Sequence, residues 1–405
     1  MGNQFTQLWS EGFQYAVERS PYYREVLGAL HSLPRLEDVP TLDKAVLSER
    51  TLDFLCVPHQ EVAEIVTTSG TTGKPLVYLL TECDLGRLGE NERQSFECAG
   101  LTARDTVLLA VTLDRCFIAG LAYWLGLRAM GCGVVRVGPG LPAMVLEMIG
   151  RVRPTAIVSV PSFLRIVAEK AAETGFNLAG SSVQKMICIG EPVRDESLAP
   201  NAMGRFLELA WSARVYSTYG VTELASSLCE CDAGAGGHLH PELLHLEILD
   251  DAGQPVPDGT VGEVVATTFG VEAMPLIRYR TGDCAALFRQ PCACGRTTPR
   301  LGPIVGRKHQ KLKVKGTTVF PSALQAVLEE TAGVETYAIV ARSEGGLSDT
   351  VEVLVCGSVS LDALRDAFRG RTKIAPLLRA ASPPEIEALQ ILPHSRKRRW
   401  FVDLR

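Results

Sequence analysis

Residues Thr67 to Pro75 read Thr-Thr-Ser-Gly-Thr-Thr-Gly-Lys-Pro, and the interpretation of the whole chain starts from this stretch. The flanking segments 64–66 and 76–80 resemble strands, so the stretch is expected to form the turn between them. Glycines let backbone amides approach an anion closely, hydroxyl groups add donors, and a lysine adds positive charge. The pattern therefore favours a turn that binds a polyphosphate over a merely flexible polar hairpin. The candidate phosphate-binding residues are Ser69, Gly70, Thr71, Thr72, Gly73 and Lys74.

This turn differs from the usual P-loop. A P-loop has four residues between its glycines, followed by lysine, a hydroxyl residue and a helix. Here two residues separate Gly70 from Gly73, and Pro75 follows the lysine. A nucleotide-binding fold other than the P-loop type is therefore expected.

Length and composition limit the class of protein. A chain of 405 residues is expected to form two or three domains, and an apolar content of 46% suffices for large cores. The formal net charge of -5, without a dominant basic face, argues against nucleic acid as the main partner. No apolar run reaches the roughly 18 to 20 residues that a membrane-spanning helix needs. Since the N-terminus also lacks a signal-peptide pattern, we expect a cytoplasmic protein without a membrane partner.

The chain contains twelve cysteines, which fall into two groups. Eight are isolated in apolar or mixed segments and are interpreted as small core residues in a reducing compartment. The other four form the pairs Cys229-Glu230-Cys231 and Cys292-Ala293-Cys294. Paired spacing of this kind indicates a metal site, with packing of four unrelated cysteines as the alternative.

Alternating strands and helices between residues 84 and 220 predict a parallel sheet covered by helices on both faces, because the strands are apolar throughout. The expected strands are 106–111, 133–137, 156–160, 185–189 and 214–217, and the expected helices include 84–99, 120–130, 141–152 and 161–174. Short strands and turns from 245 to 290 predict a small antiparallel β subdomain. After Gly306-Arg307 a smaller α+β segment follows. The expected fold is thus α/β, with a large N-terminal domain (1–305) and a small C-terminal domain (306–405).

Polar motifs follow several of these strands, where ligands of parallel sheets usually bind. Gly190-Glu191-Pro192 follows one strand, with an ordinary strand-to-helix turn as the alternative. Tyr216 to Glu223 ends another and supplies an aromatic ring, hydroxyl groups and a carboxylate, which suit a base, phosphate and Mg²⁺; its alternative is a helix cap. Asp283 is expected on a tight turn that could bind ribose, or as a turn residue bonding its own backbone. Arg307 could reach ribose or phosphate.

In this order the motifs resemble the phenylacetate-CoA ligase group of the adenylate-forming superfamily. The resemblance covers nearly the whole chain, from Ser20-Pro21-Tyr22-Tyr23 through Tyr219-Gly220-Val221-Thr222-Glu223 to Gly306-Arg307. It implies a mobile C-terminal domain, activation of a carboxylic acid by ATP through an acyl-adenylate, and transfer of the acyl group to coenzyme A. The nucleotide-binding residues that it implies, besides the turn at 69–74, are Gly190, Glu191, Pro192, Ser217, Thr218, Tyr219, Gly220, Asp283 and Arg307.

The resemblance also implies catalytic and substrate residues. Thr222 and Glu223 are expected to serve phosphate and Mg²⁺. By analogy with the aryl site of the family, Phe117, Ala119 and Gly120 are expected to line a pocket for an aromatic or arylacetic acid. The final lysine of the family corresponds to Lys397 or Arg398, within Pro393-His394-Ser395-Arg396-Lys397-Arg398, where the usual glycine is missing. A homodimer is a candidate assembly.

The resemblance to the family also indicates which cysteines and histidines bind the metal. Cys231 follows Glu230, and His238 follows a glycine-rich turn, as they do in the family. Together with Cys292 and Cys294 they would complete a closed, structural Zn²⁺ site. Two rival functions stay open: adenylation without transfer to coenzyme A, and nucleotide binding by a degenerate, non-catalytic protein, which the altered C-terminal run favours.

Overall fold

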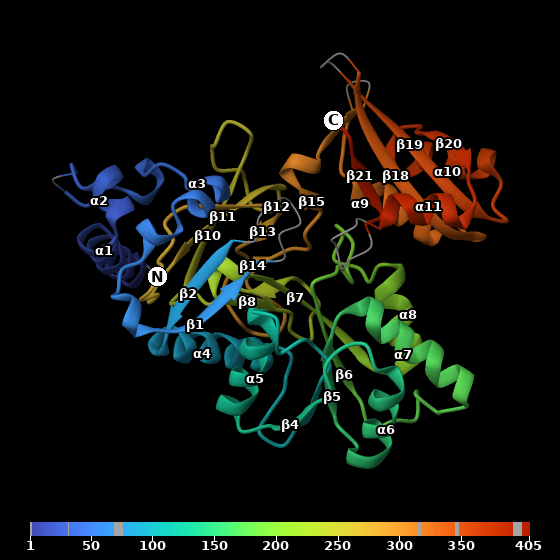
Figure 1. Cartoon of the computed structure of the whole chain (residues 1–405), viewed down its shortest axis with the longest axis horizontal. Coiled ribbons are helices and arrows are strands. Elements are labelled where there is room, and N and C mark those ends of the chain that lie inside the picture. Colours follow the sequence, from blue (N-terminus) through green and yellow to red (C-terminus); the bar gives the residue numbers. More distant parts are fainter. Residues whose placement is uncertain (1, 31, 69–75, 315–316, 345–347, 392–398) are drawn as a thin grey trace. The chain divides into compact units, whose positions relative to one another are not determined.

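The computed structural model describes residues 2–30, 32–68, 76–314, 317–344, 348–391 and 399–405 (Figure 1). The chain divides into two compact units. Unit 1 comprises residues 1–281 and 285–303, and unit 2 comprises residues 282–284 and 304–405. Among the described residues, no helix is both long and apolar enough to cross a bilayer.

A six-stranded sheet forms the centre of unit 1, with the strand order β4-β3-β5-β6-β7-β8. The first five strands are parallel, which confirms the predicted parallel sheet. The sixth strand was not predicted; it runs antiparallel because a short turn joins it directly to its neighbour. The strands are β3 (Thr106–Leu109), β4 (Gly133–Arg136), β5 (Ala156–Ser159), β6 (Lys185–Ile189), β7 (Arg214–Val221) and β8 (Ser226–Cys229).

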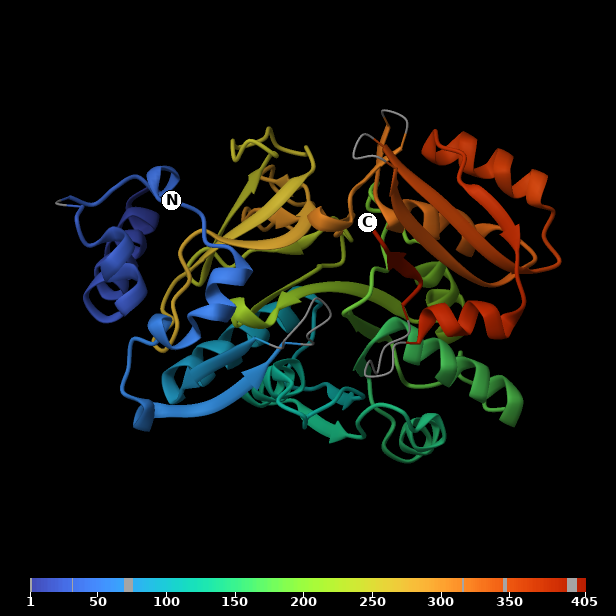
Figure 2. The same cartoon turned by 45° about the horizontal axis from the view of Figure 1, so that its top comes forward.

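Helices cover both faces of this sheet (Figures 1 and 2). One core joins Leu108 and Met186 to α6 (Pro142–Val152), α7 (Pro161–Thr174) and α8 (Ala202–Trp211). The other core joins Leu109 and Ile187 to α4 (Glu82–Cys98) and α5 (Ile118–Met130). Because neighbouring residues of one strand enter opposite cores, the strands are apolar on both sides, as the sequence predicted.

The N-terminal region leads into a separate hairpin. Its strands, β1 (Val62–Thr67) and β2 (Val77–Thr81), are antiparallel, and they correspond to the two strands expected around the Ser/Thr/Gly turn. Residues 69–75, which hold the candidate phosphate-binding residues, lie outside the described residues. The preceding elements are α1 (Gly2–Arg19), α2 (Pro21–Leu27), η1 (Leu36–Asp38), α3 (Lys44–Glu49), η2 (Thr51–Phe54) and η3 (His59–Glu61).

Two smaller antiparallel sheets confirm the predicted β subdomain. One contains β10 (Leu244–Leu249), β11 (Gly262–Thr268), β12 (Tyr279–Ala285) and β15 (Gly306–Arg307). The other contains β13 (Leu287–Phe288), β14 (Arg300–Leu301) and β9 (Gly237–His238). The expected tight turn at Asp283 is wrong: Asp283 lies inside β12 and pairs with Arg307. Thr281-Gly282-Asp283 has turn-like composition, and Gly282 has a φ of 77°, but the partner strand comes from a distant segment that local sequence cannot reveal.

Unit 2 contains a four-stranded sheet with the order β20-β19-β18-β21. The central pair is antiparallel, and each outer strand is parallel to its neighbour. Apolar side chains pack on both faces of the sheet, as expected for an α+β domain. The described elements are β16 (Leu312–Val314), β17 (Thr317–Val319), α9 (Pro321–Glu330), β18 (Val334–Glu344), β19 (Ser348–Gly357), α10 (Leu361–Thr372), β20 (Leu377–Ala380), α11 (Pro383–Gln390) and β21 (Phe401–Asp403).

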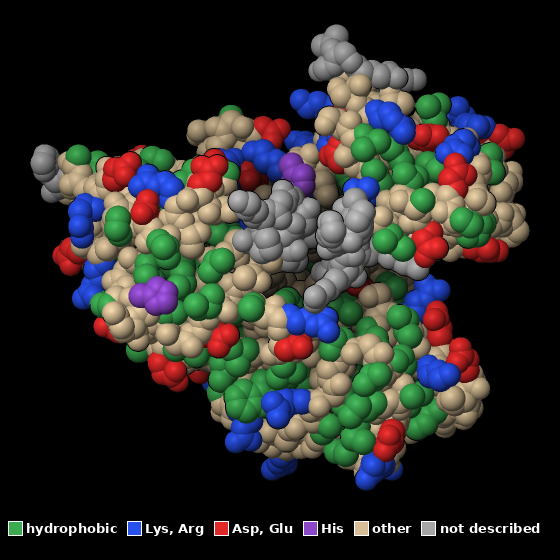
Figure 3. All heavy atoms as spheres, in the orientation of Figure 1, with side chains coloured by type: hydrophobic (Ala, Val, Ile, Leu, Met, Phe, Trp, Pro, Cys, Tyr) green, Lys and Arg blue, Asp and Glu red, His purple; other side chains and the backbone are tan. Residues whose placement is uncertain are grey.

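Charged side chains of both signs are interspersed on the face shown in Figure 3. Among the described residues, several exposed charged side chains form ion pairs one helical turn apart, such as Arg151 with Glu147 and Arg165 with Glu169. Exposed pairs of this kind contribute little to stability, typically about 0.3–0.5 kcal/mol each. They therefore act mainly as a solvated surface.

Candidate functional site

The motif Tyr219 to Glu223 lies on the β7–β8 hairpin. The expected strand ended at Ser217, but β7 continues to Val221, so Tyr219 and Gly220 are strand residues. The extra length arises because β8 returns alongside, which pairs Tyr219 with Leu228 and Gly220 with Ser227. Thr222 to Leu224 then form the single turn η4. The hairpin thus places Thr222 and Glu223 at the carboxyl end of β7, where parallel sheets bind ligands.

Glu223 is a buried carboxylate with two donors on one oxygen. Its side chain is 2% exposed, and its Oε1 accepts a hydrogen bond of 2.9 Å from the Tyr279 hydroxyl. The Lys44 ammonium lies 2.8 Å from the same oxygen. Neither partner was predicted, because each lies far from Glu223 in the sequence. An ionised carboxylate has about four lone-pair sites, so these two donors leave capacity for a metal ion.

Polar side chains on one face of α4 form hydrogen bonds with the β7–β8 hairpin and with the backbone next to it. The Arg87 guanidinium donates to Ala225 O (2.9 Å), Leu243 O (2.6 Å) and Phe269 O (2.7 Å), and to the hydroxyl of Ser226 (3.3 Å). Burial lowers the pKa of Arg87 to about 10. Ala225 has a φ of 43°, an unfavourable conformation for a residue with a side chain, and Arg87 fixes it directly after the Thr222–Leu224 turn.

One turn further along α4, three side chains hold Ser227. Asn91 accepts from the Ser227 amide at 2.7 Å, Glu92 accepts from its hydroxyl at 2.7 Å, and Ser95 donates to its carbonyl at 3.0 Å. Burial raises the pKa of Glu92 to about 8, which the Ser227 hydroxyl offsets only in part. Sequence reasoning missed this face, since polar residues at helical spacing normally indicate a solvated surface.

The Gly190-Glu191-Pro192 segment follows β6, beside β7. Gly190 has a φ of 73°, which favours glycine at this turn. The Glu191 carboxylate accepts from both the amide (2.8 Å) and the hydroxyl (2.7 Å) of Ser162, in the first turn of α7. In the structure, the Glu191 side chain therefore caps the first turn of α7. Contact between this segment and a nucleotide stays a prediction.

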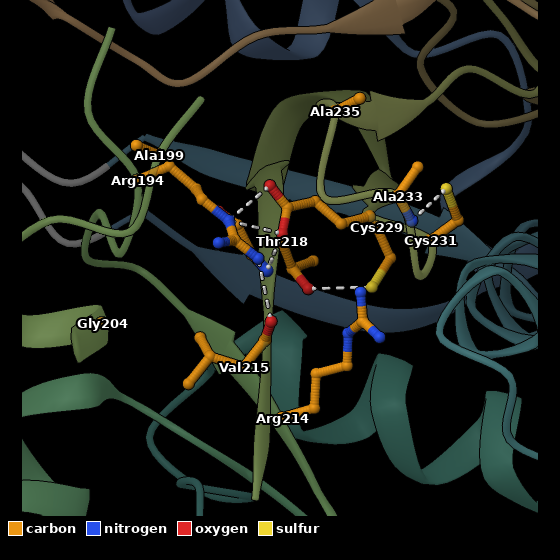
Figure 4. A network of polar contacts seen from close by, with 12 residues as sticks. Arg194, Ala199, Gly204, Arg214, Val215, Thr218, Cys229, Cys231, Ala233 and Ala235 are labelled. Carbon is orange, nitrogen blue, oxygen red and sulfur yellow. Dashed lines mark hydrogen bonds and ion pairs between the residues drawn. The ribbon is translucent and has the colours of Figure 1, made fainter. Parts of the chain in front are cut away.

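Ser217 and Thr218 lie in β7 next to a buried ion pair (Figure 4). The Ser217 amide donates to Glu230 at 3.0 Å, and the Arg194 guanidinium lies 3.1 Å from the same carboxylate. Arg194 also donates to Val215 O, and the Thr218 hydroxyl contacts the Cys229 thiol at 3.4 Å. This network fixes the backbone of β7 and so supports the motif that follows on the same strand.

The three candidate substrate residues have different surroundings. Phe117 precedes α5 and is 39% exposed, whereas Ala119 packs against a core. A Cβ on Gly120 would lie 1.9 Å from Thr112 O, so this glycine is required for helix packing. Cys116, directly before Phe117, has a φ of 55° and accepts from the Thr67 amide at 2.8 Å. The loop that carries Phe117 is thereby tied to the end of β1, the strand that precedes residues 69–75.

Cys231, His238, Cys292 and Cys294 lie together, and their ligand atoms all lie within 4.8 Å of one another. The Cys231 and Cys292 sulfurs are 3.6 Å apart, and the Cys294 sulfur is 3.5 Å from His238 Nε2. A regular tetrahedron around zinc, with Zn–S of about 2.3 Å and Zn–N of about 2.0 Å, has edges of roughly 3.8 Å and 3.5 Å. The spacing therefore fits zinc.

The surroundings of this cluster also suit a metal. His238 Nδ1 lies 3.1 Å from the Thr298 hydroxyl, which leaves Nε2 directed at the cysteines. Burial lowers the pKa of His238 to about 4 and so keeps the imidazole neutral. Burial alone would raise the pKa of the Cys294 thiol, but hydrogen bonds from Arg296, Cys231 and Cys292 outweigh this effect and bring the pKa to about 7. Neutral imidazole and accessible thiolate are the forms that bind zinc.

Asp283 and Arg307 belong to unit 2. They are backbone partners, and Arg307 Nε lies 3.4 Å from Asp283 Oδ1. Asp283 is largely buried, while Arg307 is about half exposed. Lys397 and Arg398, the candidates for the final lysine, lie outside the described residues.

Comparison with known proteins decides the family. Residues 26–272 match the model of the AMP-binding enzyme family. The chain belongs to the AMP-binding enzyme family. It is similar to the phenylacetate-coenzyme A ligase of Thermus thermophilus, with 33% identity over 83% of this chain and 77% of that protein. It is also similar to the phenylacetate-coenzyme A ligase of Aromatoleum evansii, with 29% identity over 86% of this chain and 79% of that protein.

The fold agrees with this family. The structure is similar to that of 2-hydroxyisobutyryl-CoA ligase in its postadenylation state, with a TM-score of 0.84 and 23% identity. The match covers 99% of this chain and 89% of that chain. The predicted resemblance to the phenylacetate-CoA ligase group of adenylate-forming enzymes is therefore confirmed.

Proposed function

We propose that this enzyme joins a carboxylic acid to coenzyme A at the expense of ATP, through an acyl-adenylate. The carboxylate attacks the α-phosphorus of ATP and releases pyrophosphate. The thiol of coenzyme A then attacks the acyl carbon and releases AMP. The observation that carries the proposal is the buried Glu223 carboxylate on the β7–β8 hairpin of a chain that belongs to this family.

Each group of residues has a proposed role. The turn of Ser69 to Lys74 binds the phosphates of ATP, and Tyr219 lies against the base. Thr222 and Glu223 offer the oxygen ligands that Mg²⁺ prefers. When bound, Mg²⁺ would neutralise the charge of the phosphates. Lys397 or Arg398 stabilises the reacting carboxylate, so the enzyme acts by positioning and electrostatics without a side-chain nucleophile.

The proposed acid is aromatic or arylacetic. Two relatives are named phenylacetate-coenzyme A ligases, and the exposed ring of Phe117 is available near the strand that leads into the phosphate-binding turn. Rotation of the C-terminal domain between the two half-reactions belongs to the same proposal, as does a cytoplasmic location. A homodimer is the proposed assembly.

A structural Zn²⁺ is proposed at Cys231, His238, Cys292 and Cys294. The four residues come from the segment after β8 and from the loop between β13 and β14, so a metal would tie these two segments together. Four protein ligands leave no open position for a substrate, which favours a structural role over a catalytic one.

Isotope exchange between ATP and pyrophosphate tests the proposal. The enzyme is incubated with a panel of aromatic, arylacetic and short aliphatic acids, with and without coenzyme A. Exchange that depends on the acid supports adenylation. Full turnover with acyl-CoA as product separates the proposal from adenylation alone. ATP binding without exchange for any acid would favour a degenerate nucleotide-binding protein.

A further inference from the structure

Lys44 contacts the carboxylate that is proposed to hold Mg²⁺. The Lys44 side chain is 43% exposed, while that of Glu223 is 2% exposed, so the ammonium reaches from a half-open position onto a buried charge. The Lys170–Glu173 pair differs: Lys170 is 41% exposed, and its partner Glu173 is 65% exposed. Water can solvate Glu173 without its lysine, whereas a buried carboxylate depends on its partners.

The backbone places Lys44 at this position. Two residues before it, the Leu42 amide donates to Arg278 O at 2.9 Å, and Leu42 O accepts from the Arg280 amide at 2.8 Å. The residue between these two, Tyr279, is the other donor to Glu223 Oε1. The segment that carries Lys44 is therefore bonded to the very strand that carries Tyr279, and both donors reach one oxygen.

Two arginines fix this segment further. Arg278 donates to Glu37 O (2.8 Å) and Val39 O (2.6 Å), and its position is held by an ion pair of 2.9 Å with Glu247. Arg280 donates to the Thr41 hydroxyl at 3.1 Å. A lysine on such an anchored segment loses less freedom when it pairs than one on a mobile loop would.

We propose that Lys44 is a tethered cation that occupies Glu223 in the metal-free enzyme and competes with the divalent metal for this carboxylate. The inference rests on the proposed function, because it takes Glu223 as the Mg²⁺ ligand. The ammonium compensates the buried charge before metal and nucleotide bind. Lys44 is thus a positioning residue for Glu223.

Two measurable consequences follow from electrostatics. Without the ammonium, the Tyr279 hydroxyl is the one donor to this buried carboxylate that remains among the residues that the structure describes, so the metal-free enzyme is expected to be less stable. Without the ammonium, a divalent ion also meets no like charge at the carboxylate, so it binds more tightly. A lysine with a merely structural role would produce the first effect but not the second.

The first measurement is the stability of the full chain in buffer without added Mg²⁺ or Mn²⁺, with no chelator present, so that the proposed zinc site is left intact. Thermal unfolding is compared for wild type, Lys44→Met, Glu223→Gln and the double variant; methionine keeps the apolar stem without the charge. Lys44→Met is expected to lower the unfolding temperature, and to lower it much less in the Glu223→Gln background. Lys170→Met is the matched control, with little expected change. Equal losses in both backgrounds would overturn the role of Lys44 as a counterion.

The second measurement is binding of Mn²⁺ alone, followed by the electron paramagnetic resonance of the free ion. Lys44→Met should bind Mn²⁺ at least about fivefold more tightly than wild type. Equal or weaker binding, with binding still lost in Glu223→Gln, would overturn the competition and leave the proposed function intact. If no variant shows Mn²⁺ binding that depends on Glu223, both the inference and the metal role of Glu223 are wrong.

Discussion

Replacing Arg87 by methionine tests whether α4 positions the β7–β8 hairpin that carries Thr222 and Glu223. The change removes a buried guanidinium that donates to three backbone carbonyls and one hydroxyl. Leu243 O keeps the Phe269 amide as a donor, so the loss falls mainly on Ala225 O and Phe269 O. A buried polar group without a partner costs about 1–3 kcal/mol, so the two together predict a loss of about 2–6 kcal/mol in unfolding free energy.

The position of Ala225 links this loss to catalysis. Arg87 holds Ala225, which directly follows the Thr222–Leu224 turn, so its removal should let Ala225 leave its strained backbone conformation and shift the turn. The expected result is a lower rate of ATP–pyrophosphate exchange even at temperatures where the variant is folded. Arg87→Lys, which can replace only part of the hydrogen bonds, should fall between wild type and Arg87→Met.

Urea unfolding and exchange kinetics are the two assays. Arg151→Met is the control, since Arg151 is an exposed helical arginine paired with Glu147, and it should change stability by no more than about 0.5 kcal/mol. If Arg87→Met matches this control in stability and exchange rate, the reasoning about the polar face of α4 is refuted.

Three further predictions concern the metal, the nucleotide and pH. Elemental analysis of protein purified without added metal should show about one zinc per chain, and Cys292→Ser with Cys294→Ser should lose the zinc and lower stability; metal-free wild type of undiminished stability would contradict this. Asp283→Ala should weaken ATP binding by about 1.5–3 kcal/mol in calorimetry, because ribose would lose a charged acceptor, and unchanged affinity would exclude the ribose role. Glu92 is protonated in the folded state, since burial raises its pKa from 4.5 to about 8. The stabilisation by protonated Glu92 is fully present below about pH 4.5 and is lost as the pH rises through about 8. The unfolding free energy of wild type relative to Glu92→Gln should therefore fall over this pH range. Parallel pH profiles for the two proteins would refute the interpretation of Glu92 as a buried acid.

The elements of the parallel sheet could be predicted because their signal is local. Apolar runs of four or five residues alternate with helical periodicity, and both cores of unit 1 use that pattern. The antiparallel β8 and the two-residue strand β15 escaped prediction, because their partners are set by tertiary pairing rather than by their own composition. Asp283 was assigned to a turn for the same reason.

The residues of the candidate site also divide into those with a local sequence signal and those set by tertiary contacts. The motif at Tyr219 to Glu223 and the four cysteine and histidine residues could be found from residue type, spacing and family resemblance. Lys44 and Arg87 could not, because each acts across more than fifty residues of sequence and neither belongs to a recognisable motif. Tyr279 lies in the motif that ends at Asp283, but its contact with Glu223, 56 residues away, has no local sign either. A lysine or arginine in a polar segment gives no local sign that its partner is a buried group.

The central claim is that a carboxylate attacks ATP at its α-phosphorus, and transfer of an oxygen isotope tests it most directly. An arylacetic acid that turns over is labelled with oxygen-18 in both carboxylate positions and incubated with enzyme, ATP, Mg²⁺ and coenzyme A. The bridging oxygen of the acyl-adenylate comes from the acid and stays with the nucleotide when the thiol attacks. Mass spectrometry should therefore find one oxygen-18 in the AMP and one in the acyl-CoA. Unlabelled AMP, or ADP as the nucleotide product, would contradict the account.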